Sequence, residues 1–230
     1  MSIIIDFTVT AMARHEILNN TLKSFSKNLK GINLKDCRLI INIDPLPPKI
    51  KRKSVIKVGR RYFGEVIYNL PPVANFTAAC NWVWSNAETE FIFHVEDDWQ
   101  LTTPISVPKV LRHFENNETL LQVILRAYRY RYETCSLSPS VMHKRFYSKL
   151  AGNLNTKLNP EIQLRGERFG LKMPRRGRPG ISTKGLIVVY PRPSKRIVLK
   201  DLGRVWINRT KYRKTGAGKK ARFITWETRK

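Results

Sequence analysis

Short apolar runs alternate with helix-like periodicities along the first two thirds of the 230-residue chain. Runs rich in Ile, Val, Phe and Tyr predict strands, which span residues 3–10, 37–45, 65–70, 89–99 and 121–131. Between them, apolar positions at helical spacing predict amphipathic helices, which span residues 11–29, 75–87 and 107–120. Strands that alternate with helices are typical of βαβ units. We therefore expect an α/β fold, a Rossmann-like and mostly parallel sheet with flanking helices.

Acidic residues stand where two of these predicted strands end. Asp44 ends the second strand, just before the basic, proline-rich segment 45–54, which we expect to be a loop. Glu96, Asp97 and Asp98 end the fourth strand. In parallel sheets, ligands bind outside the carboxyl ends of the strands. The acids therefore mark the expected site.

The consecutive carboxylates of Glu96, Asp97 and Asp98 repel one another unless a cation or solvent offsets their charge. If the extended geometry of the strand continues, Glu96 and Asp98 lie on the same side. Magnesium and manganese prefer oxygen ligands and commonly use one or two carboxylates together with substrate phosphates. The pattern indicates such a metal site. The alternative interpretation is an acidic turn that is solvated or paired with arginines.

The charge balance points to a polyanionic partner. The chain holds 43 Lys and Arg against 17 Asp and Glu, a formal net charge of +26. Residues 1–162 contain 22 basic and 14 acidic residues, a balance of +8, whereas residues 163–230 contain 21 and 3, a balance of +18. Nucleic acid is the first candidate and an anionic membrane surface the second. With 42% hydrophobic residues, the composition favours a folded globule over a disordered polycation.

The sequence features that bear on location favour the cytoplasm. Cys37, Cys80 and Cys135 are odd in number and scattered, which excludes a disulfide framework or a zinc spacing and favours a reducing compartment. The opening SIIIDFTVT has neither a basic n-region nor a cleavage site, so we expect no signal peptide. No apolar run approaches the roughly 20 residues that a transmembrane helix needs.

Several short motifs follow the predicted elements in a particular order. The first helix opens with a T…R…L…TLxS pattern, formed by Thr10, Arg14, Leu18, Thr21, Leu22 and Ser24. Asp44 follows the second strand, a helix with Asn75 and Asn81 precedes the fourth, and the letters EDD end it. In this order, residues 3–150 resemble nucleotide-sugar glycosyltransferases of the GT-A fold, with Glu in the first place of their DxD signature. The resemblance implies a GT-A-like fold, a nucleotide-sugar donor (UDP-sugar first) and Mn²⁺ or Mg²⁺ as cofactor.

The resemblance also assigns residues to the donor site. The residues that it places around the nucleotide sugar are Thr10, Arg14, Asp44, Asn75, Asn81, Glu96 and Arg204. Asp98 would bind the metal and the diphosphate, and Glu96 is a second candidate metal ligand. Asp97 would lie near the ribose or the metal and is a candidate catalytic carboxylate. An ordinary charge at a helix start is the alternative for Arg14.

The segment after the fifth strand resembles the acceptor side of these enzymes. A Ser-Pro-Ser turn at 138–140 is expected to precede a helix, although either serine alone is also a common helix cap. His143 would fall early in that helix, within reach of a phosphate or a sugar hydroxyl, or be structural. Glu161 is the candidate general base for the acceptor hydroxyl, a role that inverting transfer needs and retaining transfer does not. The sequence leaves that choice open.

The last third of the chain interleaves aromatic and basic residues. Aromatic faces and cations together suit a nucleic-acid surface. The predicted DNA contacts are Arg175, Arg176, Arg178, Lys211, Arg213, Lys214, Lys219 and Lys220. The alternative is that Trp206 and Trp226 pack on the core while the cations stay solvated.

A DLGRxW run near residue 201 resembles the closing segment of some glycosyltransferases. The resemblance implies that Asp201, Arg204 and Lys211 fold back over the diphosphate. GT-A enzymes often supply a late His as a further metal ligand. Because this chain has no His after residue 143, Asp201 or water would take that place.

Together these features give a leading hypothesis and two alternatives. We expect residues 1–162 to form the nucleotide-sugar and acceptor domain. Residues 163–230 would form a basic extension that packs on it and contacts the polyanion. The leading function is metal-dependent transfer of a sugar to hydroxymethylated pyrimidines in DNA. In this respect a small, basic GT-A enzyme resembles the enzymes with which some bacteriophages glycosylate such bases. One alternative is a glycosyltransferase that builds a glycan or glycolipid at an anionic membrane. The other, a nucleic-acid-binding protein without catalysis, leaves the acid triplet unexplained.

Overall fold

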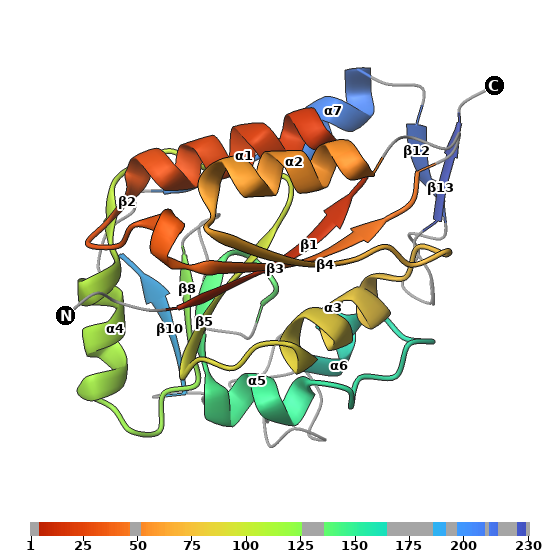
Figure 1. The fold of residues 1–230 in the computed structure, drawn as a ribbon. Helices are drawn as coiled ribbons and strands as arrows, with labels where there is room; N and C mark the ends of the chain where they lie inside the picture. Colours follow the sequence, from red (N-terminus) through yellow and green to blue (C-terminus); the bar gives the residue numbers. More distant parts are fainter. Residues whose placement is uncertain are drawn as a thin grey trace.

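Seven strands form the central sheet of the protein, in the order β10-β8-β9-β5-β1-β3-β4 in a computed structural model (Figure 1). The structure describes residues 5–46, 52–125, 136–164, 186–191 and 197–209, and the backbone of 212–215 and 225–228. The strands are β1 (Asp6–Met12), β3 (Arg38–Asp44), β4 (Glu65–Asn69), β5 (Phe91–Glu96), β8 (Gln122–Leu125), β9 (Ser140–His143) and β10 (Ile187–Tyr190). Strand β9 is antiparallel to β5 and β8, and the other neighbouring pairs are parallel.

Helices cover both faces of this sheet (Figure 1). The helices on one face are α1 (His15–Asn28), α2 (Lys53–Tyr62) and α4 (Val107–Glu115). Those on the other are α3 (Phe76–Ser85), α5 (Lys144–Leu150) and α6 (Pro160–Leu164). A 3-10 turn, η1, spans Leu34–Asp36, and α7 spans Gly203–Arg209. None of these helices combines the length and the apolarity that crossing a bilayer requires.

Three two-stranded pairs accompany the main sheet. They are β2 (Leu29–Lys30) with β7 (Ile105–Ser106), β6 (Trp99–Leu101) with β11 (Leu199–Asp201), and β12 (Tyr212–Thr215) with β13 (Thr225–Thr228). The pair β6–β11 connects the chain directly after the acid triplet to a segment about a hundred residues later. That segment therefore lies against the strand end that carries the acids.

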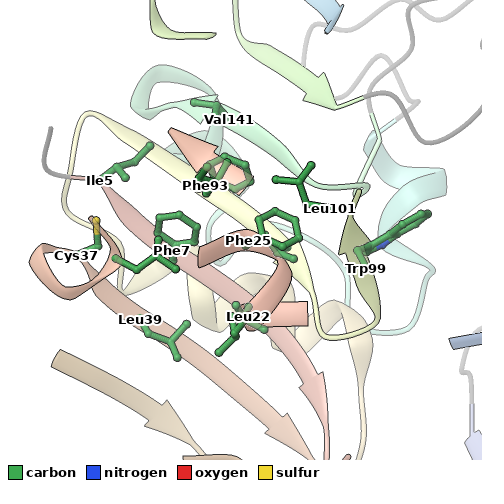
Figure 2. Close-up of a cluster of buried hydrophobic side chains, with 14 of the residues drawn as sticks. Ile5, Phe7, Leu22, Phe25, Cys37, Leu39, Phe93, Trp99, Leu101 and Val141 are labelled. Carbon is green, nitrogen blue, oxygen red and sulfur yellow. The ribbon is translucent and has the colours of Figure 1, made fainter. Parts of the chain in front are cut away.

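The α1 face has an aromatic centre (Figure 2). The rings of Phe7 on β1 and Phe93 on β5 stack at 5.0 Å, and Phe25 of α1 meets Phe93 edge-on at 5.8 Å. Helix α1 brings Phe25 there because Leu18, Leu22 and Phe25 recur at helical spacing and are all buried. This packing fixes the start of α1, and with it Arg14, at the carboxyl end of β1.

The sequence analysis predicted the α/β class correctly, and two local predictions are wrong. Helix α2 was not predicted, and its first residues, Lys53 and Ser54, lie inside the segment 45–54 that we expected to be a loop. Its Val55, Ile56 and Val58 are buried on the sheet. Residues 140–143 form strand β9 and open no helix. The helix begins one residue later, and His143 caps it by accepting a hydrogen bond from the backbone N–H of Arg145 at 3.0 Å.

A completely buried histidine lies in the face covered by α3. The Trp84 indole donates to His94 Nδ1 at 3.3 Å, and Thr8 Oγ1 lies 3.0 Å from the same nitrogen. An indole N–H can only donate, so Nδ1 accepts and the ring proton is on Nε2. Nε2 has no hydrogen-bond partner among the described residues. Burial lowers the pKa of His94 to about 3, because a charged imidazolium would lose its hydration.

His94 should lower the free energy of unfolding at acidic pH. Its folded pKa lies below its unfolded value, so unfolding takes up a proton and stability falls as the pH drops below about 6.5. In urea unfolding, wild type should lose roughly 2–3 kcal/mol relative to His94→Gln between about pH 7.5 and pH 4.5. Other titrating groups are common to both proteins and cancel. A difference that is constant over this range contradicts the prediction.

Candidate active site

A pocket opens at the carboxyl ends of β1, β3 and β5. It contains about 610 Å³ of free space, counted with its open mouth. Ala74, Phe76 and Ala79 form the wall on the α3 side. Among the predicted site residues, those that line this pocket are Thr10, Arg14, Asp44, Glu96, Asp97 and Asp98.

A row of polar side chains crosses the sheet at this end. Thr10 is in register with Asn42 on one side and Glu96 on the other, and Asn42 is in register with Asn69. Asn69 Nδ2 donates to Asn42 Oδ1 at 2.8 Å, and Asn42 Nδ2 donates to Asp44 Oδ1 at 2.8 Å. The two amides form a relay that holds the Asp44 carboxylate in one orientation.

Asp44 has a higher pKa than an ordinary aspartate. Its side chain is buried, and burial raises its pKa to about 6 while hydrogen bonds from Asn42 and the Asn75 backbone N–H act to lower it. A ligand N–H or O–H that donates to this carboxylate favours the ionised form. Beside it, the buried Thr10 hydroxyl has no hydrogen-bond partner among the described residues. Both groups are therefore available to a bound molecule.

Asp97 is the buried anchor of the acid triplet. Arg14 binds it through Nε to Oδ2 at 3.1 Å and Nη2 to Oδ1 at 2.5 Å, and the Met12 backbone N–H donates to Oδ2 at 3.1 Å. The backbone of Asp97 is held too, by Thr10 O at 3.1 Å and by the Thr21 hydroxyl at 2.6 Å. Burial raises the pKa of Asp97 to about 6 despite the nearby guanidinium. The carboxylate positions Arg14 and the turn.

Arg14 connects the acids to helix α7. Its Nη2 also donates to Asp98 Oδ2 at 3.1 Å, and its guanidinium lies 5.0 Å from the ring centroid of Trp206 on α7. Burial disfavours the charged form, yet the charges of Asp97 and Asp98 hold the pKa of Arg14 above its usual value. The helix-start charge found in the sequence is thus a buried cation between two carboxylates and an indole.

Residues 197–209, the closing segment, fold against the acid triplet. After β11 pairs with β6, the Leu202 backbone N–H donates to Asp98 O at 2.7 Å. Gly203 follows, and a Cβ at this position would lie 2.2 Å from Asp98 Oδ2 and 3.3 Å from Asp201 Oδ1. Only glycine leaves room for the Asp98 carboxylate here. These two distances also show that the carboxylates of Asp98 and Asp201 both lie close to the position of that Cβ.

The arrangement fits a divalent cation that shares its ligands with a substrate. Within the described ranges, no group of three or more His, Cys, Asp or Glu is arranged to hold a metal ion. Asp98 and Asp201 supply two neighbouring carboxylates, which is the usual protein share when phosphate oxygens complete the coordination. The other predicted ligand, Glu96, accepts a hydrogen bond from the Trp99 indole at 2.8 Å.

The two predicted asparagines of α3 hold the loop that contains Leu154 and Thr156. Asn75 caps α3 by accepting from the Ala78 backbone N–H at 2.9 Å, and its Nδ2 donates to Thr156 O at 3.1 Å. Asn81 exchanges two hydrogen bonds with the Leu154 backbone, at 2.9 and 3.2 Å. The Asn75 side chain thus faces this loop, while its backbone N–H reaches the pocket residue Asp44.

Glu161 lies on the far flank of α3. It is partly exposed on α6, and none of the described residues forms an ion pair or hydrogen bond with its carboxylate. Its charge acts on the fully buried thiol of Cys80 in α3. Burial raises the pKa of that thiol, and the charges of Glu96, Asp44 and Glu161 raise it further. Glu161 is therefore within electrostatic range of Cys80, and it does not line the pocket.

Two other predicted residues, His143 and Arg204, do not line the pocket. His143 is in register with Phe91, at the opposite end of β5 from Glu96, which places it roughly 17 Å away along the strand. Its Nε2 lies 3.5 Å from Glu90 Oε1. Arg204 is exposed on the closing segment and pairs with Asp201 at 3.2 Å.

The predicted DNA contacts have no described side chains. Those outside the described residues are Arg175, Arg176, Arg178, Lys211, Lys219 and Lys220. Arg213 and Lys214 are on β12, whose backbone alone is described.

The sequence analysis missed the residues that support the pocket from behind. Asn42 is a polar residue inside an otherwise apolar strand, and that anomaly was the available signal. Asn69 ends β4 and gives no comparable signal. Gly203 was visible only as part of the DLGRxW run. Nothing in the sequence shows that Trp206 stacks on Arg14.

Comparison with known proteins identifies the fold. No protein-family model and no curated protein matches the sequence. Among solved structures, S. aureus TarS 1–349 matches with a TM-score of 0.51 and 12% identity, over 69% of this chain and 53% of that one. Its complex with UDP matches with a TM-score of 0.52 and 11% identity over the same shares.

The mannosyltransferase PcManGT from Pyrobaculum calidifontis, in complex with GDP-Man and Mn²⁺, matches with a TM-score of 0.56 and 8% identity, over 83% of this chain and 57% of that one. The fold is GT-A-like. The predicted fold class is thereby confirmed. The chain spans little more than half the length of these structures.

Proposed function

We propose that this protein is a metal-dependent glycosyltransferase that moves a sugar from a nucleotide donor to hydroxymethylated pyrimidine bases in DNA. The observation that carries the proposal is the convergence of Asp44, Arg14 and Asp98 in one pocket at the carboxyl ends of a GT-A-like sheet. Fold neighbours with UDP, and with GDP-Man and Mn²⁺, support a nucleotide-sugar donor. We take a UDP-sugar as the first donor to test.

The donor nucleotide would occupy the polar row of the pocket. Asp44, oriented by the Asn42 relay, accepts a hydrogen bond from the base. The Thr10 hydroxyl, which has no partner among the described residues, contacts the nucleoside. Arg14 presents a permanent positive charge beside the diphosphate position, and Asp97 keeps that charge in place. Glu96 forms the wall next to the ribose.

Asp98 and Asp201 are the proposed metal ligands, with the donor's phosphate oxygens completing the coordination of Mn²⁺ or Mg²⁺. When bound, the cation neutralises the charge of the departing diphosphate. The chain's own contribution is to hold the two carboxylates close together and to keep the closing segment over them. Gly203 allows both, because it places backbone where a side chain would exclude Asp98.

The acceptor would enter from the side of α3 and α6. Glu161 is the proposed base, because its carboxylate is unpaired among the described residues and its helix, α6, packs against α3, which forms one wall of the pocket. In that role it takes the proton of the acceptor hydroxyl as that oxygen attacks the sugar carbon. This assignment belongs to inverting transfer.

The strong positive charge favours DNA as the acceptor. Residues 163–230 have a balance of +18, and the enzyme must follow phosphates to reach a base hydroxyl. We propose that the predicted cations, Arg175 to Lys220 among them, form part of this surface. The activity would belong to the cytoplasm, where nucleotide sugars and DNA are both present.

The test is donor hydrolysis and transfer with Mn²⁺, using a panel of UDP- and GDP-sugars and duplex DNA that contains 5-hydroxymethylpyrimidines. Nucleoside mass spectrometry after digestion should show a hexose- or pentose-sized gain on the modified base that EDTA abolishes. Metal-dependent donor hydrolysis without a DNA product would refute the acceptor and favour a glycan or lipid. No turnover of any donor would refute the enzyme.

A further inference from the structure

Helix α2 carries a row of cations on its outer face. Lys53, Lys57, Arg60 and Arg61 are exposed, and the helix contains no acidic residue. None of the four forms an ion pair within the part of the chain that the structure describes. Their direction is fixed, because the opposite face of the helix is buried on the sheet. Gly59 permits a close approach, since a Cβ there would lie 2.7 Å from Leu39 Cδ2.

A polar groove between α1 and α2 lies beside this row. It has about 980 Å³ of free space, counted with its open mouth. Hydrogen-bond donors line it from both helices: Asn19 and Asn20 from α1, and Ser54, Lys57 and Arg61 from α2. Glu16 is the one acid in the lining. The groove thus adds neutral donors to the cations, a combination that proteins use on phosphate oxygens.

This surface begins next to the donor pocket. His15, which also lines the groove, directly follows Arg14. Arg52, at the start of α2, donates to Ile43 O at 3.3 Å and to Pro71 O at 2.5 Å. These bonds fix the start of the helix to the strand end that carries Asp44. In Figure 1, α7 lies beside the same end of α1.

We infer that the outer face of α2 and the adjoining groove bind the phosphate backbone of duplex DNA. The inference rests on the proposed function and adds a contact surface that the basic C-terminal residues do not include. From Lys53 through Lys57 to Arg61 the helix rises about 12 Å in two steps of roughly 6 Å, so the row can serve several phosphates of one strand. A phosphate bound at the start of α2 would place the duplex beside the strand end that carries Asp44.

The same geometry argues against a lipid surface. A helix that lies in a membrane interface buries an apolar face in the lipid. The apolar residues of α2, including Val55, Ile56 and Val58, are instead buried in the protein core. What α2 presents to solvent is charge without an adjoining apolar stripe.

The test compares two charge reversals of equal size. Lys57→Glu/Arg61→Glu changes the proposed surface, and Lys109→Glu/Arg112→Glu changes two exposed cations on α4, outside the groove and the pocket. Binding of a fluorescent, unmodified duplex is measured by anisotropy between about 50 and 200 mM salt. The α2 variant should bind about tenfold more weakly or worse, and its salt slope should fall by about 2, since each lost phosphate contact removes about 0.9. The α4 variant should keep the wild-type slope.

Each outcome has a separate meaning. Equal slopes for the two variants would overturn the inference, and so would anionic vesicles that compete for α2 better than DNA does. Lys57→Gln/Arg61→Gln, which removes charge without reversing it, should reproduce half or more of the effect. Thermal unfolding checks that all variants fold. Sugar transfer by the wild type is measured separately. If the α2 variant binds DNA like wild type and wild type transfers sugar, only this surface is refuted. If the α2 variant binds DNA more weakly but wild type transfers no sugar, the proposed function is refuted.

Discussion

Replacing Asp98 with Asn is expected to reduce sugar transfer about 100-fold or more while the protein stays folded. The side chain of Asp98 is 22% exposed, lines the pocket and lies beside Asp201. An amide of the same shape keeps the packing against Gly203 but removes the charge that a cation needs. The backbone bond from Leu202 remains, so the closing segment should stay in place.

Two measurements separate loss of the cation from loss of the fold. Binding of Mn²⁺ followed by electron paramagnetic resonance should weaken in Asp98→Asn, independently of any turnover. Thermal unfolding should stay close to that of wild type, because Arg14 still pairs with Asp97. Asp36→Asn, at an exposed acid of η1, is the matched control and should change neither. Transfer by Asp98→Asn within about a factor of two of wild type would remove Asp98 from the proposed site.

Replacing Arg14 with Met is expected to destabilise the protein by about 3–5 kcal/mol. Asp97 is buried and relies on Arg14 for two of its hydrogen bonds, so the substitution leaves an unpaired carboxylate in the core. In thermal unfolding the loss should appear as a fall of roughly 6 °C or more. Arg204→Met, which breaks an exposed ion pair on the closing segment, should cost less than about 1 kcal/mol.

The penalty should also depend on pH in a defined direction. The charge of Arg14 lowers the pKa of Asp97, so its loss raises that pKa further above about 6. An acid with a raised folded pKa destabilises the folded state increasingly as the pH rises from its unfolded pKa through the folded one. Arg14→Met should therefore lose more stability at about pH 8 than at about pH 5.5. Arg14→Met/Asp97→Asn should recover part of the loss, and a penalty that is independent of pH and unrelieved in the double variant would contradict the ion-pair account.

The sequence correctly predicted the strands and helices that have a clear local pattern of apolar residues. Strands β1, β3 and β5 are continuous apolar runs, and α1 has a clear helical stripe, so their order along the chain already indicated the carboxyl-end site. Helix α2 was missed because it is short, has Gly59 inside it and follows a proline-rich segment. Strand β9 has four residues and forms only by pairing with two strands distant in sequence.

The position of the site was predictable from the sequence, but the hydrogen bonds and ion pairs within it were not. Asp44 and the acid triplet were identified because they end apolar strands. The bonds that define their roles join residues far apart in sequence, such as Arg14 to Asp97 across 83 positions and Asn42 to Asn69 across 27. Sequence periodicity contains no information on such pairs. His143 was misplaced for the same reason, since only the register of β9 on β5 shows which end of the sheet it occupies.

The position of β9 in the sheet also bears on how the chain acquires its structure. Strand β8 is synthesised before β9, yet in the finished sheet it connects to β5 only through β9. Until residues 140–143 are synthesised, β8 cannot join the rest of the sheet. Strand β10 pairs with β8, so it can join only after β8. The half of the molecule built on β1, β3 and β4 has no such dependence. Folding during translation should therefore proceed outward from the half that carries β1, β3 and β4, and the other edge of the sheet should form only after β9.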